Sequence, residues 1–299
     1  MSGERLRGTL AVLVACGLWG LSALYWGLVA HVPALEVLAH RTLWSFVFFG
    51  AFLLAQRRGR DLGALLRGPG RGWVLAASLA VAANWFFYVW SVSNGYALEA
   101  SLGYYIFPLV AVFLGMVVFG ERLTWRMAAA IGLAVAAVVI LTYGLGVAPY
   151  IALILAGTFG VYGMLKKRIE AEPMVSVTAE VTLLAPLALG WLIGVHLGWF
   201  PGGIGAFGGN FQDSFVLAFA GVFTGLPLVL FAYGAQRLPL GQVGVLQYIN
   251  PTLQFFIAVW VLGETATGWH LGALTLIWVA VAIYSLEALR ADRGQGRNR

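Results

Sequence analysis

The stretch YYIFPLVAVFLGMVVFGE, residues 104–121, returns as QYINPTLQFFIAVWVLGE at residues 247–264. In both copies a Tyr-Ile-x-Pro motif leads into an apolar run that ends in Gly-Glu, and matched positions are 143 residues apart. The chain therefore contains an internal repeat of about half its length. We place the two related domains at residues 1–147 and 148–299, the second with a short C-terminal tail.

The first parts of the two halves also match, at a spacing of 140 residues, as Pro33 and Pro173 do. Each half carries five apolar segments long enough to cross a bilayer. Because five is an odd number, the second half must enter the membrane in the orientation opposite to the first. Inverted repeats are typical of transporters that work by alternating access, so the repeat predicts transport.

The composition places the chain in a membrane. Of its 299 residues 61% are hydrophobic and only 10% are charged, whereas soluble domains carry about 25% charged residues. So few charges cannot cover a surface that faces water. The single cysteine, Cys16, lies in an apolar segment, which excludes a disulfide within the chain and a cysteine metal site.

Ten segments are apolar over about 20 residues, the length that crosses a bilayer as a helix. We expect an all-α integral membrane protein with ten transmembrane helices in two inverted five-helix repeats. The expected spans are residues 8–29, 34–55, 72–94, 98–119, 124–145, 149–166, 174–198, 214–236, 240–262 and 267–289. The longest connections between them are residues 56–71 and 199–213.

The positive charges orient this ten-span model. Of the 18 lysines and arginines, all except Arg41 fall on one side of it, in six short segments. Cytoplasmic segments of membrane proteins concentrate these residues, so we expect a protein of the cytoplasmic (inner) membrane with both termini in the cytoplasm. Their scatter over six segments also argues against a nucleic-acid partner, despite the net charge of +6.

Arg41 lies inside the second expected span, about 10 Å from its outer end at 1.5 Å per residue. Burying an arginine there costs at least about 2.5 kcal/mol on insertion scales. In a structural interpretation, Arg41 reaches outward or pairs with Glu36, His40 or Glu99 to hold helices together. In a functional interpretation, its planar guanidinium binds an anionic group of the substrate, and a carboxylate fits best.

Polar side chains recur at helical spacing in the third, fourth and ninth expected spans, which places them on one face of each helix. Amides are costly in lipid unless they are hydrogen-bonded. These stripes therefore either line a water-filled substrate path or join helices to one another. The candidate substrate-binding residues are Arg41, Asn84, Tyr88, Ser91, Tyr104, Gln247, Asn250 and Gln254.

Two prolines and three titratable residues are further candidates. Pro108 and Pro251 stand at matched mid-span positions, where each removes a backbone hydrogen bond; they act either as hinges or as static kinks. Glu99 near the outer end of span 4, Glu180 six residues into span 7, and His40 are candidates for proton coupling or for pairing between helices.

Two further glutamates and four aromatic residues also have a structural interpretation. Glu121 and Glu264 each follow a glycine at the end of a span, and we expect them to complement the N-terminus of the next helix. Four aromatic residues either line a cavity or anchor helices at the interface, namely Tyr25, Trp85, Trp90 and Tyr162.

Taken in order, these motifs resemble the EamA-type drug/metabolite transporter superfamily, and specifically its RarD branch. The resemblance covers nearly the whole chain and rests on Gly17-Leu18-Trp19-Gly20, Arg41, Asn84-Trp85, residues 98–104 with Pro108, residues 246–252 and the two Gly-Glu pairs. It implies a central cavity between the repeats, and export or exchange of amino-acid-like metabolites or drugs. Phe107 departs from the pattern, since the family places an asparagine before this proline, as Asn250 does in the second half.

The function expected is that of a secondary transporter of small organic metabolites. The alternative is a channel, or a membrane protein that binds a ligand without coupled transport. An enzyme is disfavoured, because the four histidines lack metal-binding spacing and no G-x-S-x-G motif occurs. No P-loop suggests the use of ATP. We expect a small-molecule substrate and membrane lipid as partners, with no nucleic acid, metal or cofactor, and a monomer or a homodimer.

Reporter fusions test the orientation. Fusions after Arg60 and Lys167 should report a cytoplasmic position, because the positive residues around them resist translocation. Fusions after Tyr96, Gly146 and Gly208 should report an extracytoplasmic position. A reversed signal at any two of these five positions would contradict the ten-span model.

Overall fold

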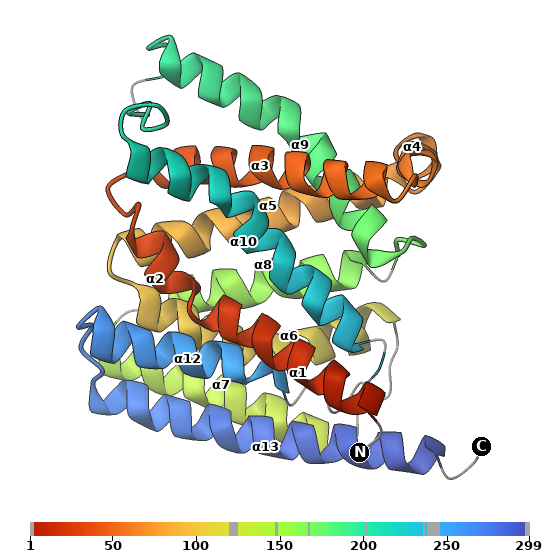
Figure 1. Cartoon of the computed structure of the whole chain (residues 1–299). Helices are drawn as coiled ribbons and strands as arrows, with labels where there is room; N and C mark the ends of the chain where they lie inside the picture. The colour runs from red at the N-terminus through yellow and green to blue at the C-terminus, as the bar shows by residue number, and fades with distance from the viewer. Residues whose placement is uncertain are drawn as a thin grey trace. The chain divides into compact units, whose positions relative to one another are not determined.

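The computed structural model describes residues 3–119, 125–146, 149–166, 168–200, 203–235, 237 and 246–296. Within these ranges every regular element is a helix (Figure 1). The elements are α1 (Gly3–Gly20), α2 (Ser22–Gly27), α3 (Ala34–Ala55), α4 (Gly59–Arg67), α5 (Arg71–Ser93), α6 (Ala97–Phe119), α7 (Trp125–Leu145), α8 (Tyr150–Lys166), α9 (Pro173–His196), α10 (Phe211–Ala235), α12 (Ile249–Phe256), the π-helix η1 (Ile257–Val261) and α13 (Gly268–Gly296).

Helices are the expected result for apolar segments that must satisfy their own backbone hydrogen bonds in lipid. Five described segments are long and apolar enough to cross a membrane, namely Leu6–Gly27, Ala34–Ala55, Arg71–Ser93, Pro173–His196 and Phe211–Phe231. Shorter apolar helices include Ala128–Gly144, Tyr150–Lys166, Ile249–Val261 and Gly268–Ile283. The expected all-helical fold with apolar, membrane-length helices is thus confirmed over the described residues. That the chain crosses the membrane ten times stays a prediction.

Contacts divide the chain into two compact units. Unit 1 comprises Met1–Leu21, Gly95–Gly160 and Leu230–Arg299, and unit 2 comprises Ser22–Asn94 and Val161–Val229. Each unit draws segments from both halves of the sequence. The units therefore do not coincide with the two repeats, and the repeat boundary at residue 147 stays a prediction.

In unit 1, α7 and α13 lie side by side (Figure 1). Small side chains allow this contact, because Ala130 and Ala134 of α7 are buried together with Ala280 of α13. α12 packs against α1 and α6, and a Cβ atom on Gly20 would lie 2.6 Å from Leu253 Cβ. Gly20 therefore permits an approach of α12 to α1 that any larger residue would prevent.

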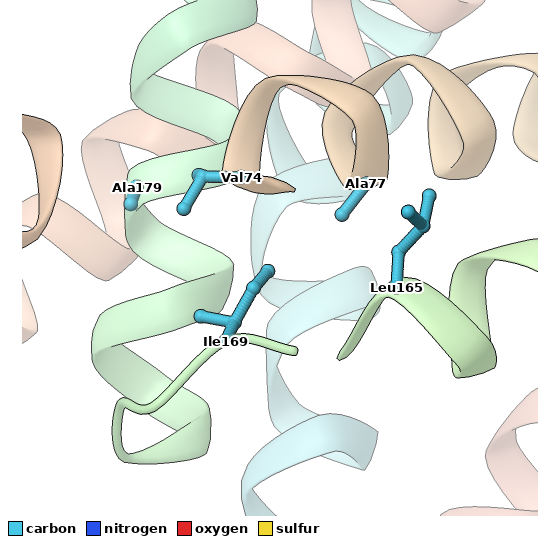
Figure 2. Close-up of a cluster of buried hydrophobic side chains, with 5 residues drawn as sticks. All are labelled: Val74, Ala77, Leu165, Ile169 and Ala179. Carbon is cyan, nitrogen blue, oxygen red and sulfur yellow. The ribbon is translucent and has the colours of Figure 1, made fainter. Parts of the chain in front are cut away.

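In unit 2, α3 packs against α5 and α9, and α5 also packs against α9. Figure 2 shows where α5, the end of α8 and α9 meet. We call this group the α5–α9 cluster, and its buried members are Val74, Ala77, Leu165, Ile169 and Ala179.

The connection between spans 2 and 3 is not simply a loop, because it contains the helix α4. Leu62, Leu65 and Leu66 recur at a spacing of three and one, which puts them on one face of the helix. This face packs against the α5–α9 cluster. The apolar contact explains why a short helix forms here, although the segment is too short and too polar to be predicted as a membrane span.

α10 makes a close approach to α3. A Cβ atom on Gly221 would overlap the backbone of Trp44, and one on Gly225 would lie 2.5 Å from Phe48 Cε1. The spacing of four residues puts both glycines on one face of α10. This is the small-xxx-small arrangement that brings membrane helices into direct backbone contact.

Glu264 caps a helix, but not the one that the sequence predicted. Its two carboxylate oxygens accept hydrogen bonds from the backbone N–H groups of Ala97 and Leu98, each at 2.7 Å. The capped helix is therefore α6 rather than the following α13. Residues 263–267 are not helical and begin with Gly263 at a positive φ of 73°, so the chain turns away before α13 begins.

Substitution of Gly221 should destabilise unit 2. Gly221→Ala puts a methyl group against backbone atoms of α3 that cannot move aside, and overpacking of this kind costs about 1–3 kcal/mol. Gly190→Ala on α9 is the matched control, since a Cβ atom there meets nothing within 4 Å. Thermal unfolding in detergent should show a lower midpoint for Gly221→Ala only. Equal midpoints would contradict the close contact between α3 and α10.

Candidate functional site

Arg41 lies two turns into α3, in unit 2, and only 8% of its surface is exposed. Its guanidinium carbon lies 4.1 Å from the centre of the Trp85 ring and 5.1 Å from that of Trp26. Trp26 comes from α2 and Trp85 from α5, so three helices meet around the cation. The two cation–π contacts offset part of the cost of removing the charge from water.

Two tyrosines belong to the same group of residues. The hydroxyl of Tyr88 on α5 lies 2.7 Å from the hydroxyl of Ser22 on α2. Tyr25 of α2 donates a hydrogen bond to the backbone carbonyl of Val216 on α10. Both tyrosines lie within electrostatic reach of Arg41. We call this group the Arg41 cluster, and its members are Ser22, Tyr25, Trp26, Arg41, Trp85 and Tyr88.

The Arg41 cluster is suited to an anion. A guanidinium carries five N–H donors in one plane. Paired hydrogen bonds from such a plane hold carboxylates and phosphates. The hydroxyls of Tyr25, Tyr88 and Ser22 add neutral hydrogen-bonding groups to the cluster.

The predicted polar stripe of α5 is only partly associated with this cluster. Tyr88 belongs to it, and the buried Asn84 directly precedes Trp85. Ser91 is buried too, but its hydroxyl donates to the carbonyl of Phe87 in the same helix, at 2.5 Å. Ser91 therefore satisfies its own donor locally, as serines in membrane helices commonly do.

His40 and Trp44 form a second polar face of α3. The ring of Phe207, from the segment before α10, lies 5.0 Å from that of His40 and 6.0 Å from that of Trp44. Both ring nitrogens of His40 and the indole nitrogen of Trp44 are buried and have no hydrogen-bond partner among the described residues. Phe207 thus covers polar atoms whose bonding capacity is unused, which is unusual in a protein interior.

Glu36 anchors the segment that carries Phe207. Its carboxylate is fully buried and accepts backbone hydrogen bonds from Ile204 at 2.9 Å, Gly205 at 3.3 Å and Ala206 at 2.7 Å. Three donors around one carboxylate compensate for its removal from water. The sequence offered Glu36 as a partner for Arg41, but the structure shows both of its oxygens bonded to this segment.

Asp213 holds the other end of the same segment. Its carboxylate accepts a hydrogen bond from Asn210 at 2.6 Å and lies 2.9 Å from the ring nitrogen of His31. The backbone N–H of Asp213 donates in turn to the side chain of Asn210 at 2.7 Å. Residues 203–213 are therefore tied down at both ends.

The amide residues predicted for span 9 lie in unit 1. Asn250 and Gln254 are one turn apart on α12, and the amide nitrogen of Gln254 donates to Asn250 at 2.9 Å and to the carbonyl of Trp19 at 3.3 Å. The side-chain oxygen of Gln254 is buried without a partner among the described residues. Gln247 lies just before α12 and is half buried. In the described structure Gln254 joins α12 to α1, and Asn250 accepts a hydrogen bond from Gln254 within α12.

Tyr104 makes a ring contact with α8. Its ring lies 6.0 Å from that of Phe159 on α8, edge to face. Its neighbour Tyr105 makes the polar contact instead, with its hydroxyl 2.6 Å from that of Thr252 on α12. Adjacent residues of a helix point about 100° apart, so Tyr104 and Tyr105 contact different neighbours.

The two candidate hinges differ in what the structure describes. Pro251 lies in the first turn of α12, which begins at Ile249, and not in the middle of a helix. A helix has no internal partner for the N–H groups of its first turn, so Pro251 costs no bond there. Pro108 lies within α6, but its side chain is outside the described residues. Within the described residues of span 9, η1 is a π-helical turn, and it carries no signal in the sequence.

The two acidic candidates, Glu180 and Glu99, have different surroundings. Glu180, which is 2% exposed, pairs with Lys166 at 2.6 Å and accepts a hydrogen bond from Tyr162 at 3.0 Å. Glu180 is therefore paired in this structure, and the side chain of Lys166 is 23% exposed. Glu99 is half buried in the first turn of α6. Over the residues that the structure describes, no three His, Cys, Asp or Glu side chains are placed to hold a metal ion.

Sequence reasoning missed Ser22, Trp26 and Phe207. Ser22 and Trp26 are four residues apart, so helical spacing would have grouped them once the short helix α2 was recognised. Phe207 lies in a glycine-rich connection that shows no periodic pattern, and only its distant anchor Glu36 places it. No local signal in the sequence reports that contact.

Comparison with known proteins adds family information. A model of the EamA-like transporter family matches residues 6–143 and again residues 147–286. The chain is 40% identical to the uncharacterized transporter YojE of Bacillus subtilis over 97% of each chain. It is 38% identical to the protein RarD of Streptomyces exfoliatus over 97% of this chain and 91% of the relative. A crystal structure that is 24% identical shares the fold, with a TM-score of 0.61 over 95% of this chain and 99% of the other.

Neutralising Glu36 should release the Phe207 segment. In Glu36→Gln an amide N–H group faces backbone N–H donors, and a buried donor without a partner costs about 1–3 kcal/mol. Hydrogen exchange at Ile204 and Ala206 should become faster. The control is Glu172→Gln, whose side chain is 41% exposed in its pair with Arg58. Unchanged exchange in Glu36→Gln would show that the carboxylate does not hold the segment.

Proposed function

Because the chain belongs to the EamA-like transporter family, we propose that it is a secondary transporter of small organic metabolites, either amino-acid-like compounds or drugs. It works by alternating access across the cytoplasmic membrane, in export or exchange, as inverted repeats predict. The double match of the family model supports two repeats that meet near residue 147. The distribution of lysine and arginine supports ten spans with both termini in the cytoplasm.

The observation that carries this proposal for the site is the burial of Arg41 between two indole rings. Charged residues inside membrane segments are expensive, and they mostly mark a path for substrate or ions. We assign to Arg41 the binding of an anionic group on the substrate, with a carboxylate as the best fit. Tyr88 and Asn84 lie on the adjacent helix, where they can contact the polar remainder of the same molecule.

The other predicted residues receive narrower roles. Tyr104, Gln247, Asn250 and Gln254 stay candidates for substrate binding in unit 1, with Gln254 the best placed because its buried oxygen lacks a described partner. Ser91 supports its own helix. His40 offers two unused nitrogen atoms beneath Phe207, so we keep it as a second contact for substrate or proton. The hinge role of Pro108 and Pro251, and coupling through Glu99 or Glu180, stay predictions.

Substitution of Arg41 tests the assignment. A thermal-shift screen of the purified protein identifies ligands, because occupancy stabilises the folded state. The stabilising compounds should carry a carboxylate, and their methyl esters should not stabilise. Arg41→Lys keeps the charge but loses the planar donor pair, so affinity should fall about tenfold or more, since charge-assisted hydrogen bonds contribute about 1.5–3 kcal/mol.

Two controls separate binding from folding and transport from passive flow. Arg7→Lys changes an arginine that is 72% exposed and should leave affinity unchanged. Arg41 variants should keep the unfolding temperature of the ligand-free parent within a few degrees. Vesicles preloaded with unlabelled ligand should accumulate labelled ligand faster than empty vesicles. Cationic ligands, or an Arg41→Ala variant of parental affinity, would overturn the role of Arg41, and the lack of acceleration by preloading would favour a channel.

A further inference from the structure

Unit 2 carries a second set of arginines that the transport site does not use. Four of them, in and beside α4, are exposed, and no ion pair joins them to the described acidic residues: Arg57, Arg60, Arg67 and Arg71. Their neighbour Arg58 is different, because it pairs with Asp61 at 2.8 Å and also with Glu172. Five arginines and one aspartate within residues 57–71 leave a net charge of +4 (5 − 1). Most of this charge is therefore available to a partner.

The fold directs this charge outward. Leu62, Leu65 and Leu66 bind α4 to the α5–α9 cluster, the buried group drawn in Figure 2. Arg60 and Arg67 are seven residues apart and exposed, which places them on the same outer face of the helix, about 10 Å from each other along its axis. Apolar packing on one face thus holds the arginines of the other face in a fixed row.

The position of α4 in the chain identifies the partner. The helix joins two segments that are long and apolar enough to cross a membrane, Ala34–Ala55 and Arg71–Ser93. Arg57 follows the first segment by two residues and Arg71 begins the second. The row of arginines therefore lies at the depth where the hydrocarbon ends and lipid headgroups begin. Trp73 is exposed at the same level, beside Arg168 at 5.6 Å, as aromatic residues at membrane interfaces often are.

We propose that α4 is a binding site for anionic phospholipids. The planar guanidinium groups of Arg60 and Arg67 hold the headgroup phosphates, and Arg57 and Arg71 extend the positive field at either end. This site depends on the membrane location of the chain and not on transport, so it stands or falls separately from the role of Arg41. A soluble acidic partner fits less well, because the hydrocarbon boundary on both sides of α4 brings phosphate groups into contact without any further protein.

A fluorescent label on α4 makes the proposal measurable. Cys16 is buried and free, so Cys16→Ser with Ala64→Cys provides one reactive thiol at an exposed position between Arg60 and Arg67. The labelled protein is reconstituted into phosphatidylcholine vesicles. Quenching is then compared between trace phosphatidylglycerol and trace phosphatidylcholine, each with a quencher on an acyl chain. We expect phosphatidylglycerol to be preferred by about tenfold, and the preference to fall as salt is raised.

Matched variants decide the outcome. Arg60→Gln/Arg67→Gln should reduce the preference to about twofold, while Arg57, Arg58 and Arg71 preserve the positive charge of the connection. Arg60→Lys/Arg67→Lys should keep most of it. Arg7→Gln/Arg126→Gln removes the same charge elsewhere and should have no effect. Equal quenching by the two lipids in the parent, or an unchanged preference in Arg60→Gln/Arg67→Gln, would overturn the proposal.

Discussion

A bilayer offers no water to a backbone N–H group, so every interruption of a helix within it must be satisfied by the protein itself. Where one helix is connected to the next, two carboxylates satisfy backbone N–H groups in this structure. Glu36 accepts three N–H groups of residues 204–206, and Glu264 accepts the first N–H groups of α6. Each partner is more than 160 residues away in the sequence, and each contact joins one half of the chain to the other. The irregular segments of the fold are therefore held by a few long-range anionic contacts.

The same constraint explains how much could be predicted from the sequence. Hydrophobic length located the long described helices, and the cost of burying a charge singled out Arg41. The break of span 1 after Gly20, the helix α4 and the π-helical turn η1 escaped prediction, because each depends on what packs against it. For example, Gly20 leaves space for Leu253, a residue from the other half of the chain. Partners at such sequence distances leave no periodic signal along the chain.

The candidate site residues divide along similar lines. Residue type and depth in the membrane identified Arg41, but not the Trp26 ring that covers it. Helical spacing placed Ser91 on a shared face, yet could not reveal that its hydroxyl bonds to its own helix. The two units also differ in chemistry. Unit 2 buries a cation among aromatic rings and hydroxyl groups, whereas the described polar contacts of α12 in unit 1 involve neutral amides, hydroxyls and carbonyls.

The π-helical turn η1 has a mechanical consequence. The N–H of Leu262 donates to the carbonyl of Ile257, five residues back, and that of Glu264 to Ala258, six residues back. Such a turn holds one residue more than an α-helical turn. If it tightened into an α-helix, the residues after it would rotate by about 100° and advance by about 1.5 Å. Glu264 would then lose its hydrogen bonds to the N–H groups at the start of α6. A change of η1 from π-helix to α-helix is therefore coupled to the loss of the cap of α6.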